Sequence, residues 1–191
     1  MTCHLARPSP PISGSAPWQK ELFRDDDLRL RLDATVTLLL RLAGTVTERL
    51  AAGGEEESEY DMLSGVYNRH GLKKALEREI ERSERYGSNL AILIMDLDRF
   101  GIINEQFGRQ TGDRVLKGLG NVLDGLTRRT DVIARLDNDE FCLLLPGLDF
   151  TGAVNAARRF QREITTWSNS ALHNVPVSLS CGIALYSKGD K

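Results

Sequence analysis

The apolar run Leu90–Met95, followed by the letters DLD, constrains the fold more than any other stretch of this sequence. An apolar run of this length, preceded by the uncharged residues GSN and followed by charged ones, is typical of a buried β-strand, here with carboxylates at its C-terminal end. Around it, residues 59–187 alternate between strand-like and amphipathic helical segments, which predicts one α/β (α+β) domain. Helices are predicted at 70–86, 112–126 and 151–165, and strands at 131–136, 141–145 and 175–186, the last as one strand or a pair.

The composition argues against several common classes of protein. A formal net charge of −2 offers none of the basic excess with which proteins bind nucleic acid. The cysteines Cys3, Cys142 and Cys181 are scattered without a CxxC pair, so we expect neither a zinc site nor a disulfide framework. The longest apolar stretch, 34–46, contains Arg41 and is too short to span a bilayer. We therefore expect no membrane segment, no signal peptide and a cytoplasmic protein.

The chain is predicted to divide near residue 55. Residues 1–25 are rich in Pro, Ser and Gly, which predicts a disordered tail. Residues 26–54 predict an amphipathic, coiled-coil-like helix and a linker, because two glycines end the helix before an acidic EEESE joint. The apolar seam of this helix has heptad spacing, at Leu32, Val36, Leu39, Ala43, Val46 and Leu50. Such a seam favours a homodimer or a helical partner protein, and packing on the chain's own domain is the alternative.

A predicted hairpin carries an acidic tip. The letters DNDE, residues 137–140, separate two predicted strands. Two carboxylates brought together repel unless a cation separates them, and Mg²⁺ favours one or two carboxylates plus phosphate oxygens. Asp96 and Asp139, with Glu140, therefore indicate a Mg²⁺-nucleotide site at a strand end. The alternative is a solvent-exposed acidic turn, because Asp and Asn are common turn residues.

Four segments resemble, in the family's order, the motifs of GGDEF domains, the diguanylate cyclase family. The first two are DMLSGVYNR (61–69), which resembles DxLTGLxNR, and MDLDRFGIINEQFGRQTGD (95–113), which resembles DxDxFKxxNDxxGHxxGD. The others are RRTDVIARLDNDEF (128–141), which resembles RxxD, five residues and GGDEF, and VSLSCGIA (177–184), which resembles V-S-x-G-I-A. The resemblance covers residues 59–187.

This resemblance implies both a fold and an activity. The implied fold, over residues 55–191, is a central sheet wrapped by helices, related to nucleotide cyclase and polymerase palm domains. The helix predicted at 26–54 precedes it. The implied activity joins two GTP molecules, each held by one of two facing domains, into cyclic di-GMP.

The resemblance also implies roles for individual residues. Asp139 and Glu140 match catalytic positions, and Asp96 and Asp139 match ligands of Mg²⁺, which is needed only if GTP is bound. Asn104 and Asp113 match the residues that read the edge of guanine. An amide and a carboxylate suit that edge, because guanine offers acceptors at O6 and N7 and donors at N1 and N2.

Several positions depart from the family pattern. Asp137 and Asn138 stand where the family has two glycines, which allow positive φ and a close approach of phosphate to the backbone. Asn and Asp tolerate left-handed backbone, so we expect the hairpin to persist. The Asp137 carboxylate would still oppose a triphosphate, by on the order of 4 kcal/mol at about 4 Å and an effective dielectric of about 20. Gly101 replaces a common Lys, and Arg109 replaces His.

The family pattern continues beyond the last matched strand. There it has a helix of the form ADxALYxAKxxGRN, whose Lys and Arg contact phosphates, whereas this sequence ends at SKGDK. We therefore expect this helix and two phosphate contacts to be absent. Together with Asp137, Asn138 and Gly101, this predicts cyclase activity that is lost or very weak, with Asp139 and Glu140 vestigial.

Arg128 and Asp131 match the family's RxxD site for cyclic di-GMP, five residues ahead of the GGDEF position. A guanidinium can fork onto guanine O6 and N7 or onto phosphate, and a carboxylate can accept from the guanine donors. The alternative is structural, because Arg128 and Arg129 follow a predicted helix and cations are favoured at helix C-termini.

The sequence supports three hypotheses. The leading one is a receptor that binds cyclic di-GMP at Arg128 and Asp131 and signals through its N-terminal helix. The second is a weakly active diguanylate cyclase that uses Asp96, Asp139 and Glu140 on GTP. The third is a dimerising protein-interaction module that binds no nucleotide.

Overall fold

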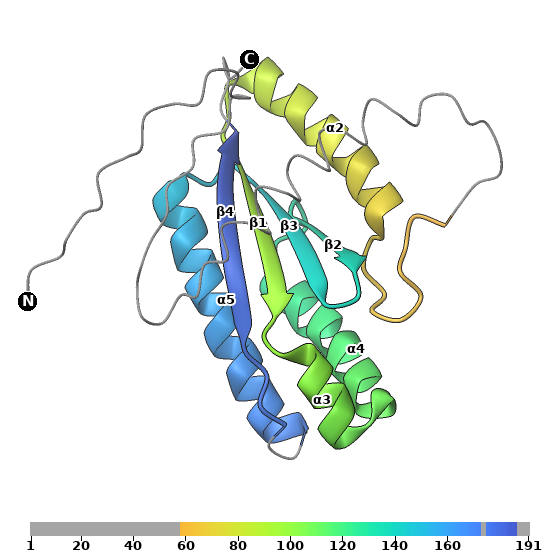
Figure 1. Cartoon of the computed structure of the whole chain (residues 1–191). Coiled ribbons are helices and arrows are strands. Elements are labelled where there is room, and N and C mark those ends of the chain that lie inside the picture. The colour runs from red at the N-terminus through yellow and green to blue at the C-terminus, as the bar shows by residue number, and fades with distance from the viewer. Residues whose placement is uncertain (1–57, 173–174, 187–191) are drawn as a thin grey trace, which may run out of the picture.

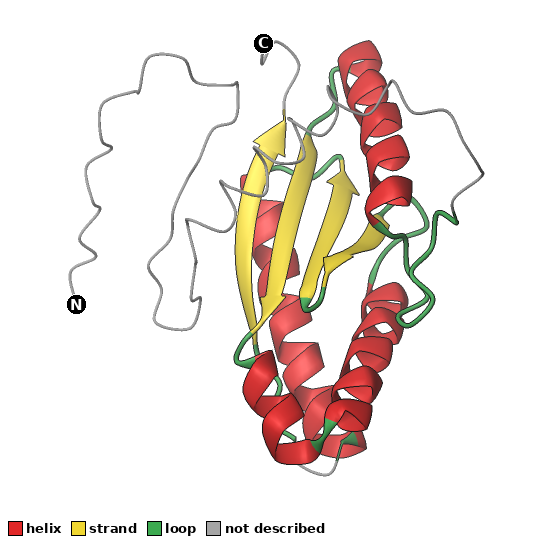
Figure 2. Ribbon diagram, turned by 45° about the vertical axis from the view of Figure 1, so that its right-hand side comes forward, coloured by secondary structure: helices red, strands yellow, loops and turns green. Residues whose placement is uncertain are grey.

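The computed structural model describes residues 58–172 and 175–186. Within these residues one layer of strands carries helices against both faces (Figure 1, Figure 2). In chain order the elements are α2 (Arg69–Tyr86), β1 (Leu90–Leu97), α3 (Phe100–Phe107), α4 (Arg109–Leu126), β2 (Val132–Asp137), β3 (Glu140–Pro146), α5 (Phe150–Ala171) and β4 (Leu179–Tyr186). The predicted tail at 1–25 and the predicted helix at 26–54 lie outside the described residues.

The strands of the described residues form a sheet in the order β2-β3-β1-β4, and each pair of neighbours is antiparallel. β1, which contains the apolar run, is central and pairs with β3 on one side and β4 on the other. β2 and β3 form the predicted hairpin. Because β3 runs antiparallel to β1, the start of β3 lies beside the C-terminal end of β1. The turn of the hairpin therefore lies next to that end, which is where α/β folds usually place ligands.

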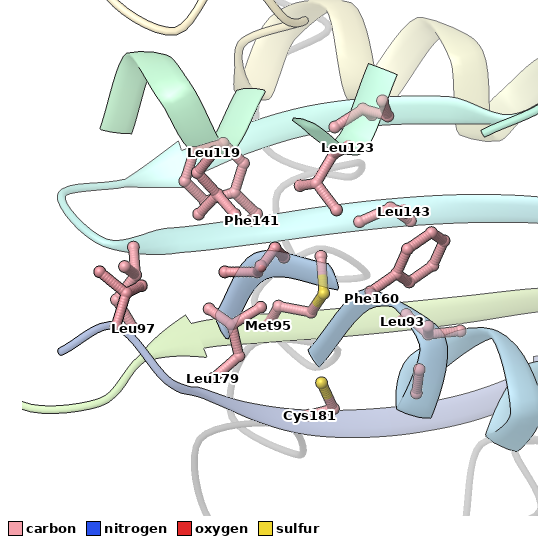
Figure 3. Close-up of a cluster of buried hydrophobic side chains, with 14 of the residues drawn as sticks. Leu93, Met95, Leu97, Leu119, Leu123, Phe141, Leu143, Phe160, Leu179 and Cys181 are labelled. Atoms are coloured by element: carbon pink, nitrogen blue, oxygen red, sulfur yellow. The ribbon is translucent and has the colours of Figure 1, made fainter. Parts of the chain in front are cut away.

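Both faces of the sheet are buried, which explains the unbroken apolar run. The odd residues of β1 from 91 to 97 belong to a large cluster shared with α4 and α5. The even residues from 90 to 94 belong to a second cluster, shared with α2. Figure 3 shows part of the large cluster, in which Leu93 and Met95 of β1 lie near Phe141 and Phe160. A strand covered on both faces has no solvent-facing side, so it carries no alternating polar residues.

α2 begins and ends at capping residues. The side-chain oxygen of Asn68 accepts hydrogen bonds from the backbone N–H groups of His70 (2.9 Å) and Gly71 (3.0 Å). At the other end Gly87 adopts a φ of 66°, and its N–H donates to the carbonyl of Ser83 (2.8 Å). The helix predicted at this place is confirmed, with a start one residue earlier.

Other boundaries differ from the sequence pattern. α3 was not expected from periodicity, because it has only two buried residues, Phe100 and Ile103, and these form too short a pattern. Gly108, with a φ of 82°, separates α3 from α4. The segment predicted as one strand or a pair is a single strand that begins at Leu179. It begins after Pro176, which has no N–H to donate to a strand ladder.

Candidate functional site

The tip of the β2–β3 hairpin is a turn of two residues, Asn138 and Asp139. On either side of the turn, Asp137 of β2 pairs with Glu140 of β3. A β-bulge lies just before this pair, where the register shifts between Arg135 and Asp137. A bulge increases the local twist of a strand, which helps a short turn to close.

The turn contains no left-handed backbone. In residues 58–172 and 175–186 the one non-glycine residue with positive φ is Arg99. The hairpin persists as expected, but the tolerance of Asp137 and Asn138 for left-handed backbone is not the reason. Replacing glycine at these two positions therefore introduces no backbone strain, and any effect on ligand binding must come from the side chains.

Asp137 and Asn138 are both exposed at this tip. The N–H of Asn138 donates to the Asp137 side-chain oxygen Oδ1 at 2.9 Å, so the carboxylate folds back on its own backbone. Solvent screens an exposed charge strongly. The repulsion between Asp137 and a phosphate is therefore smaller than the value of about 4 kcal/mol that an effective dielectric of about 20 gives at about 4 Å.

The structure brings together the three acidic residues that the sequence predicts. Asp96 of β1 lies directly opposite Glu140 of β3, and opposite residues of antiparallel strands point to the same face of the sheet. Asp139 is adjacent, because its carbonyl oxygen accepts a hydrogen bond from the N–H of Leu97 (3.2 Å). All three acidic residues are half-buried. They therefore meet where the end of β1 reaches the hairpin tip.

This junction offers few protein ligands to a metal. Among the residues that the structure describes, no group of three or more His, Cys, Asp or Glu side chains lies close enough to hold a metal ion. Asp96 and Asp139 offer carboxylate oxygens, which are hard donors that suit Mg²⁺. Mg²⁺ usually takes one or two carboxylates and completes its coordination with phosphates and water, so this donor set fits a nucleotide-bound Mg²⁺.

The two residues predicted to read guanine lie on neighbouring helices. Asn104 belongs to α3 and Asp113 to α4, and these helices pack against each other. The side-chain oxygen of Asn104 lies against Gly112, where a side chain would collide with it. Asn104 therefore sits next to the backbone that precedes Asp113, whose side chain is exposed.

An ion pair that the sequence pattern does not predict joins the hairpin tip to the loop before α2. Arg135 Nη1 contacts Asp61 Oδ1 at 3.0 Å, and Arg135 Nε and Nη2 donate to the Asn138 carbonyl at 3.1 and 2.7 Å. The two side chains are only 14% and 25% exposed. Burial raises the pKa of the Asp61 carboxyl, but hydrogen bonds from Ser64 and Arg135 outweigh burial and hold this pKa below its usual value.

Arg128 and Asp131 line a pocket of about 430 Å³. The loop before α2, the C-terminal half of α4 and the segment that enters β2 supply its other walls. The N–H of Arg128 donates to Asp131 Oδ2 (2.8 Å), and the N–H of Asp131 donates to the Arg128 carbonyl (2.9 Å). These two bonds fix the RxxD turn. The volume falls within the range of small-molecule sites.

The C-terminal end of α4 is stabilised by residues other than Arg128. Arg159 of α5 donates to the carbonyl of Leu126 at 2.9 Å. The hydroxyl of Thr127 donates to the carbonyls of Leu123 and Asp124, at 3.0 and 3.2 Å. A cation is therefore already present at this helix end, which weakens the structural explanation of the exposed Arg128.

Sequence reasoning missed the aromatic residues of this pocket. Tyr60 and Tyr67 both line it, and their rings stack with centroids 4.7 Å apart and planes at 20°. Arg129 lines it as well. One sequence signal could have found this pair. The two tyrosines lie on either side of the turn sequence LSG, and residues that face each other across a hairpin have such a spacing.

The described residues all fall within the match of one family model. The family model described as diguanylate cyclase, GGDEF domain, matches residues 58–191. The chain belongs to the GGDEF family. This confirms the family and the fold expected from the four motifs. The motif that names the family reads DNDEF here, at residues 137–141.

Three relatives illustrate the similarity of this GGDEF chain to known proteins. Diguanylate cyclase DgcS of Shewanella oneidensis is 29% identical over 144 residues, which are 69% of this chain and 47% of DgcS. The structure of diguanylate cyclase SiaD of Pseudomonas aeruginosa, solved in complex with its activator SiaC, matches with a TM-score of 0.64 at 26% identity. The match covers 84% of this chain and 60% of the SiaD chain. A microbial GGDEF domain, solved for its interaction with cyclic di-GMP, matches with a TM-score of 0.61 at 26% identity. The match covers 70% of this chain and 82% of that domain's chain.

The chain spans only part of the length of the relative DgcS, of which 47% is matched. The GGDEF family belongs to cyclic di-GMP signalling, and its cyclases in general use Mg²⁺ with GTP. None of the helices within the described residues has the length and hydropathy needed to cross a membrane.

Proposed function

We propose that this GGDEF chain is a receptor for cyclic di-GMP whose cyclase activity is lost or very weak. The observation that carries the proposal is the pocket of about 430 Å³, which both Arg128 and Asp131 line. A concave site with a few convergent polar groups is the usual form of a small-molecule site. A GGDEF domain 26% identical to this chain interacts with cyclic di-GMP, which supports that ligand here.

The chemistry of the RxxD turn suits a guanine dinucleotide. Arg128 is exposed, and Arg159 already serves the adjacent helix end, so the Arg128 fork can address guanine O6 and N7 or a phosphate. Asp131 uses one side-chain oxygen to accept the Arg128 N–H. Its carboxylate retains acceptor capacity for the N1 and N2 donors of guanine.

Two side-chain differences support a weak or lost cyclase activity. Asp137 places a negative charge where the family pattern has glycine beside the triphosphate, and Gly101 removes a common lysine. Both changes act against a polyanionic substrate. Because Asp137 is exposed, its effect is moderate, and a weakly active diguanylate cyclase is the second candidate function.

The geometry of the junction favours this second candidate over a complete loss of nucleotide binding. Asp96 lies opposite Glu140, and the turn between β2 and β3 is free of positive φ. In a cyclase, Asp96 and Asp139 would hold Mg²⁺, which would offset phosphate charge and polarise a hydroxyl when bound. Asn104 of α3 and Asp113 of α4 would together orient the guanine.

The proposal extends to partners and location. Residues 26–54, outside the described part, would connect the receptor to a second copy or to another protein. The related SiaD is solved with an activator protein. Cys142 and Cys181 are free and buried, which fits a reducing compartment and a cytoplasmic protein.

Isothermal titration with cyclic di-GMP, repeated with Mg²⁺-GTP, tests this function. We expect micromolar binding of the dinucleotide by the wild type. Arg128→Ala should weaken it by about tenfold to a hundredfold, the range for a charge-assisted hydrogen bond. Arg162→Ala serves as the matched control, because Arg162 is an exposed arginine on α5 outside the pocket.

Three results would contradict the proposal. Wild-type binding to GTP alone, with turnover to cyclic di-GMP, would favour the cyclase. Binding of the dinucleotide by Arg128→Ala as tightly as by Arg162→Ala would exclude the RxxD site. If neither nucleotide binds, the remaining hypothesis of a protein-interaction module gains over both.

A further inference from the structure

The stacked pair of Tyr60 and Tyr67 lines the pocket but lies outside the RxxD motif. Tyr60 and Tyr67 precede the motif by more than sixty positions, yet both line the same pocket as Arg128 and Asp131. Tyr60 remains 52% exposed although its ring stacks on Tyr67. An exposed ring at the wall of a polar pocket is available to stack on a planar ligand.

The backbone holds this pair rigidly. The N–H of Tyr67 donates to the Ile133 carbonyl (3.1 Å), and the Tyr67 carbonyl accepts from the N–H of Arg135 (2.7 Å), so Tyr67 extends the edge of β2. Tyr60 pairs with Tyr67 in an antiparallel bridge, and Asn68 Nδ2 donates to the Tyr60 carbonyl (3.3 Å). The rings are therefore placed before any ligand arrives, which reduces the entropy lost on binding.

The formal charges of the described residues that line the pocket balance. Arg128 and Arg129 contribute two positive charges, and Asp124 and Asp131 contribute two negative charges. A dianionic dinucleotide thus gains no net attraction from the pocket as a whole, and local hydrogen bonds and stacking must supply the affinity. A tyrosine phenol is neutral near pH 7, and a hydrogen bond with Tyr67 raises the pKa of Tyr60 further, so this ring adds no negative charge to the pocket.

We propose that Tyr60, supported by Tyr67, is the base-stacking residue of this pocket. Its exposed ring face receives a guanine of the dinucleotide, while the polar groups of the ligand reach Arg128 and Asp131. This inference rests on the proposed receptor function, which it deepens by adding a binding residue outside the RxxD motif. Stacking on an aromatic ring is suited to a base because it uses the flat face and leaves the edge for hydrogen bonds.

Titration of the full chain with cyclic di-GMP tests the role of Tyr60. Tyr60→Leu keeps the apolar volume but removes the aromatic face, and should weaken binding about tenfold to a hundredfold. Tyr60→Phe keeps the face and should bind within about twofold of the wild type. Tyr86→Leu is the matched control, because Tyr86 is 71% exposed at the end of α2 and does not line the pocket.

A second measurement separates stacking from a structural effect. The guanine H8 proton resonance of the saturated ligand should shift upfield with the wild type and Tyr60→Phe, and this shift should be absent with Tyr60→Leu. If Tyr60→Leu binds like the wild type while Arg128→Ala does not, the stacking role is overturned and the receptor function stands. A wild type that binds no cyclic di-GMP overturns both. Loss of affinity in Tyr60→Leu with the H8 shift retained also overturns the stacking role.

Discussion

Asp61 and Arg135 carry a contact on which both the hairpin tip and the pocket wall depend. Asp61 directly follows the pocket residue Tyr60, and Arg135 holds the carbonyl of Asn138 at the tip. The ion pair is mostly buried, and hydrogen bonds keep the pKa of Asp61 low. We therefore expect this pair to stabilise the fold in a way that depends on pH.

Asp61→Asn should lower the free energy of unfolding by about 1–2 kcal/mol at pH 7, because the charged partner of Arg135 is lost. The folded pKa of Asp61 lies below its unfolded value. The carboxylate therefore contributes its full stability above about pH 4 and loses it as the pH falls through the lowered folded pKa. Urea unfolding between pH 7 and pH 3 should show the difference between wild type and variant shrinking as the pH falls.

Glu59 offers a matched control in the same segment. It pairs with Lys74 at 2.6 Å, but the side chains are 33% and 47% exposed. A hydrogen bond from Lys74 lowers the pKa of Glu59, yet exposed pairs contribute little to stability. Glu59→Gln should leave unfolding unchanged, and an Asp61→Asn variant that behaves in the same way would contradict the role of the buried pair.

Asp137 and Gly101 are the residues to which the proposal attributes a cyclase activity that is lost or very weak. The turn needs no positive φ, and a Cβ at Gly101 would meet nothing within 4 Å, so the backbone accepts the residues of the family pattern at these positions. Asp137→Gly combined with Gly101→Lys should strengthen Mg²⁺-GTP binding by roughly tenfold, because one repulsive charge is removed and one attractive charge is added. Calorimetric titration measures the effect, and unchanged binding would contradict the attribution.

At the scale of elements, α4 approaches the loop before α2 more closely than a side chain permits. A Cβ at Gly120 would lie 2.5 Å from the carbonyl oxygen of Ser64. A Cβ at Gly125, in the same helix, would meet nothing within 4 Å. The first glycine is therefore required by packing against the pocket wall, and the second is not.

Gly120→Ala should destabilise the protein by about 1–3 kcal/mol, because the loop that carries Ser64 must move, and overpacking outweighs the better helix propensity of Ala. The same movement should weaken cyclic di-GMP binding, because Ser64 and Tyr60 lie in one pocket wall. Gly125→Ala should instead raise stability by up to about 1 kcal/mol. Urea unfolding and calorimetric titration of both variants measure this, and equal behaviour of the two would contradict the packing argument.

At the scale of the whole molecule, the described walls of the pocket come from one continuous segment of the chain. Of the residues that the structure describes, those that line the pocket all lie between Tyr60 and Ile133, although they come from a loop, a helix and a strand. The sheet and its two hydrophobic clusters hold these elements together. Ligand binding should therefore depend on the GGDEF domain and not on residues 1–57.

A chain shortened to begin at residue 58 should bind cyclic di-GMP with the affinity of the full chain, within about twofold. Calorimetric titration of both chains under the same conditions makes the comparison, and thermal unfolding shows whether the shortened chain is folded. A folded shortened chain that binds much more weakly would show that residues 1–57 contribute to the site.

The sequence by itself determined the family, the buried central strand and the amphipathic helices. These features are local, because burial on both faces leaves an unbroken apolar run in β1, and a helix repeats its apolar face every three or four residues. The acidic residues at the strand end and hairpin tip also predicted that Asp96 and Glu140 lie together, and the two residues do lie opposite each other.

Only the tertiary structure decided how these parts meet. Asp61 and Arg135 are 74 positions apart, and Tyr60 reaches the RxxD pocket only because its segment pairs with the edge of β2. α3 has too few buried residues to produce a pattern, and the turn at Asn138 closes through a bulge that no residue type signals. Contacts between distant segments depend on the packing of whole elements, so no short stretch of sequence contains them.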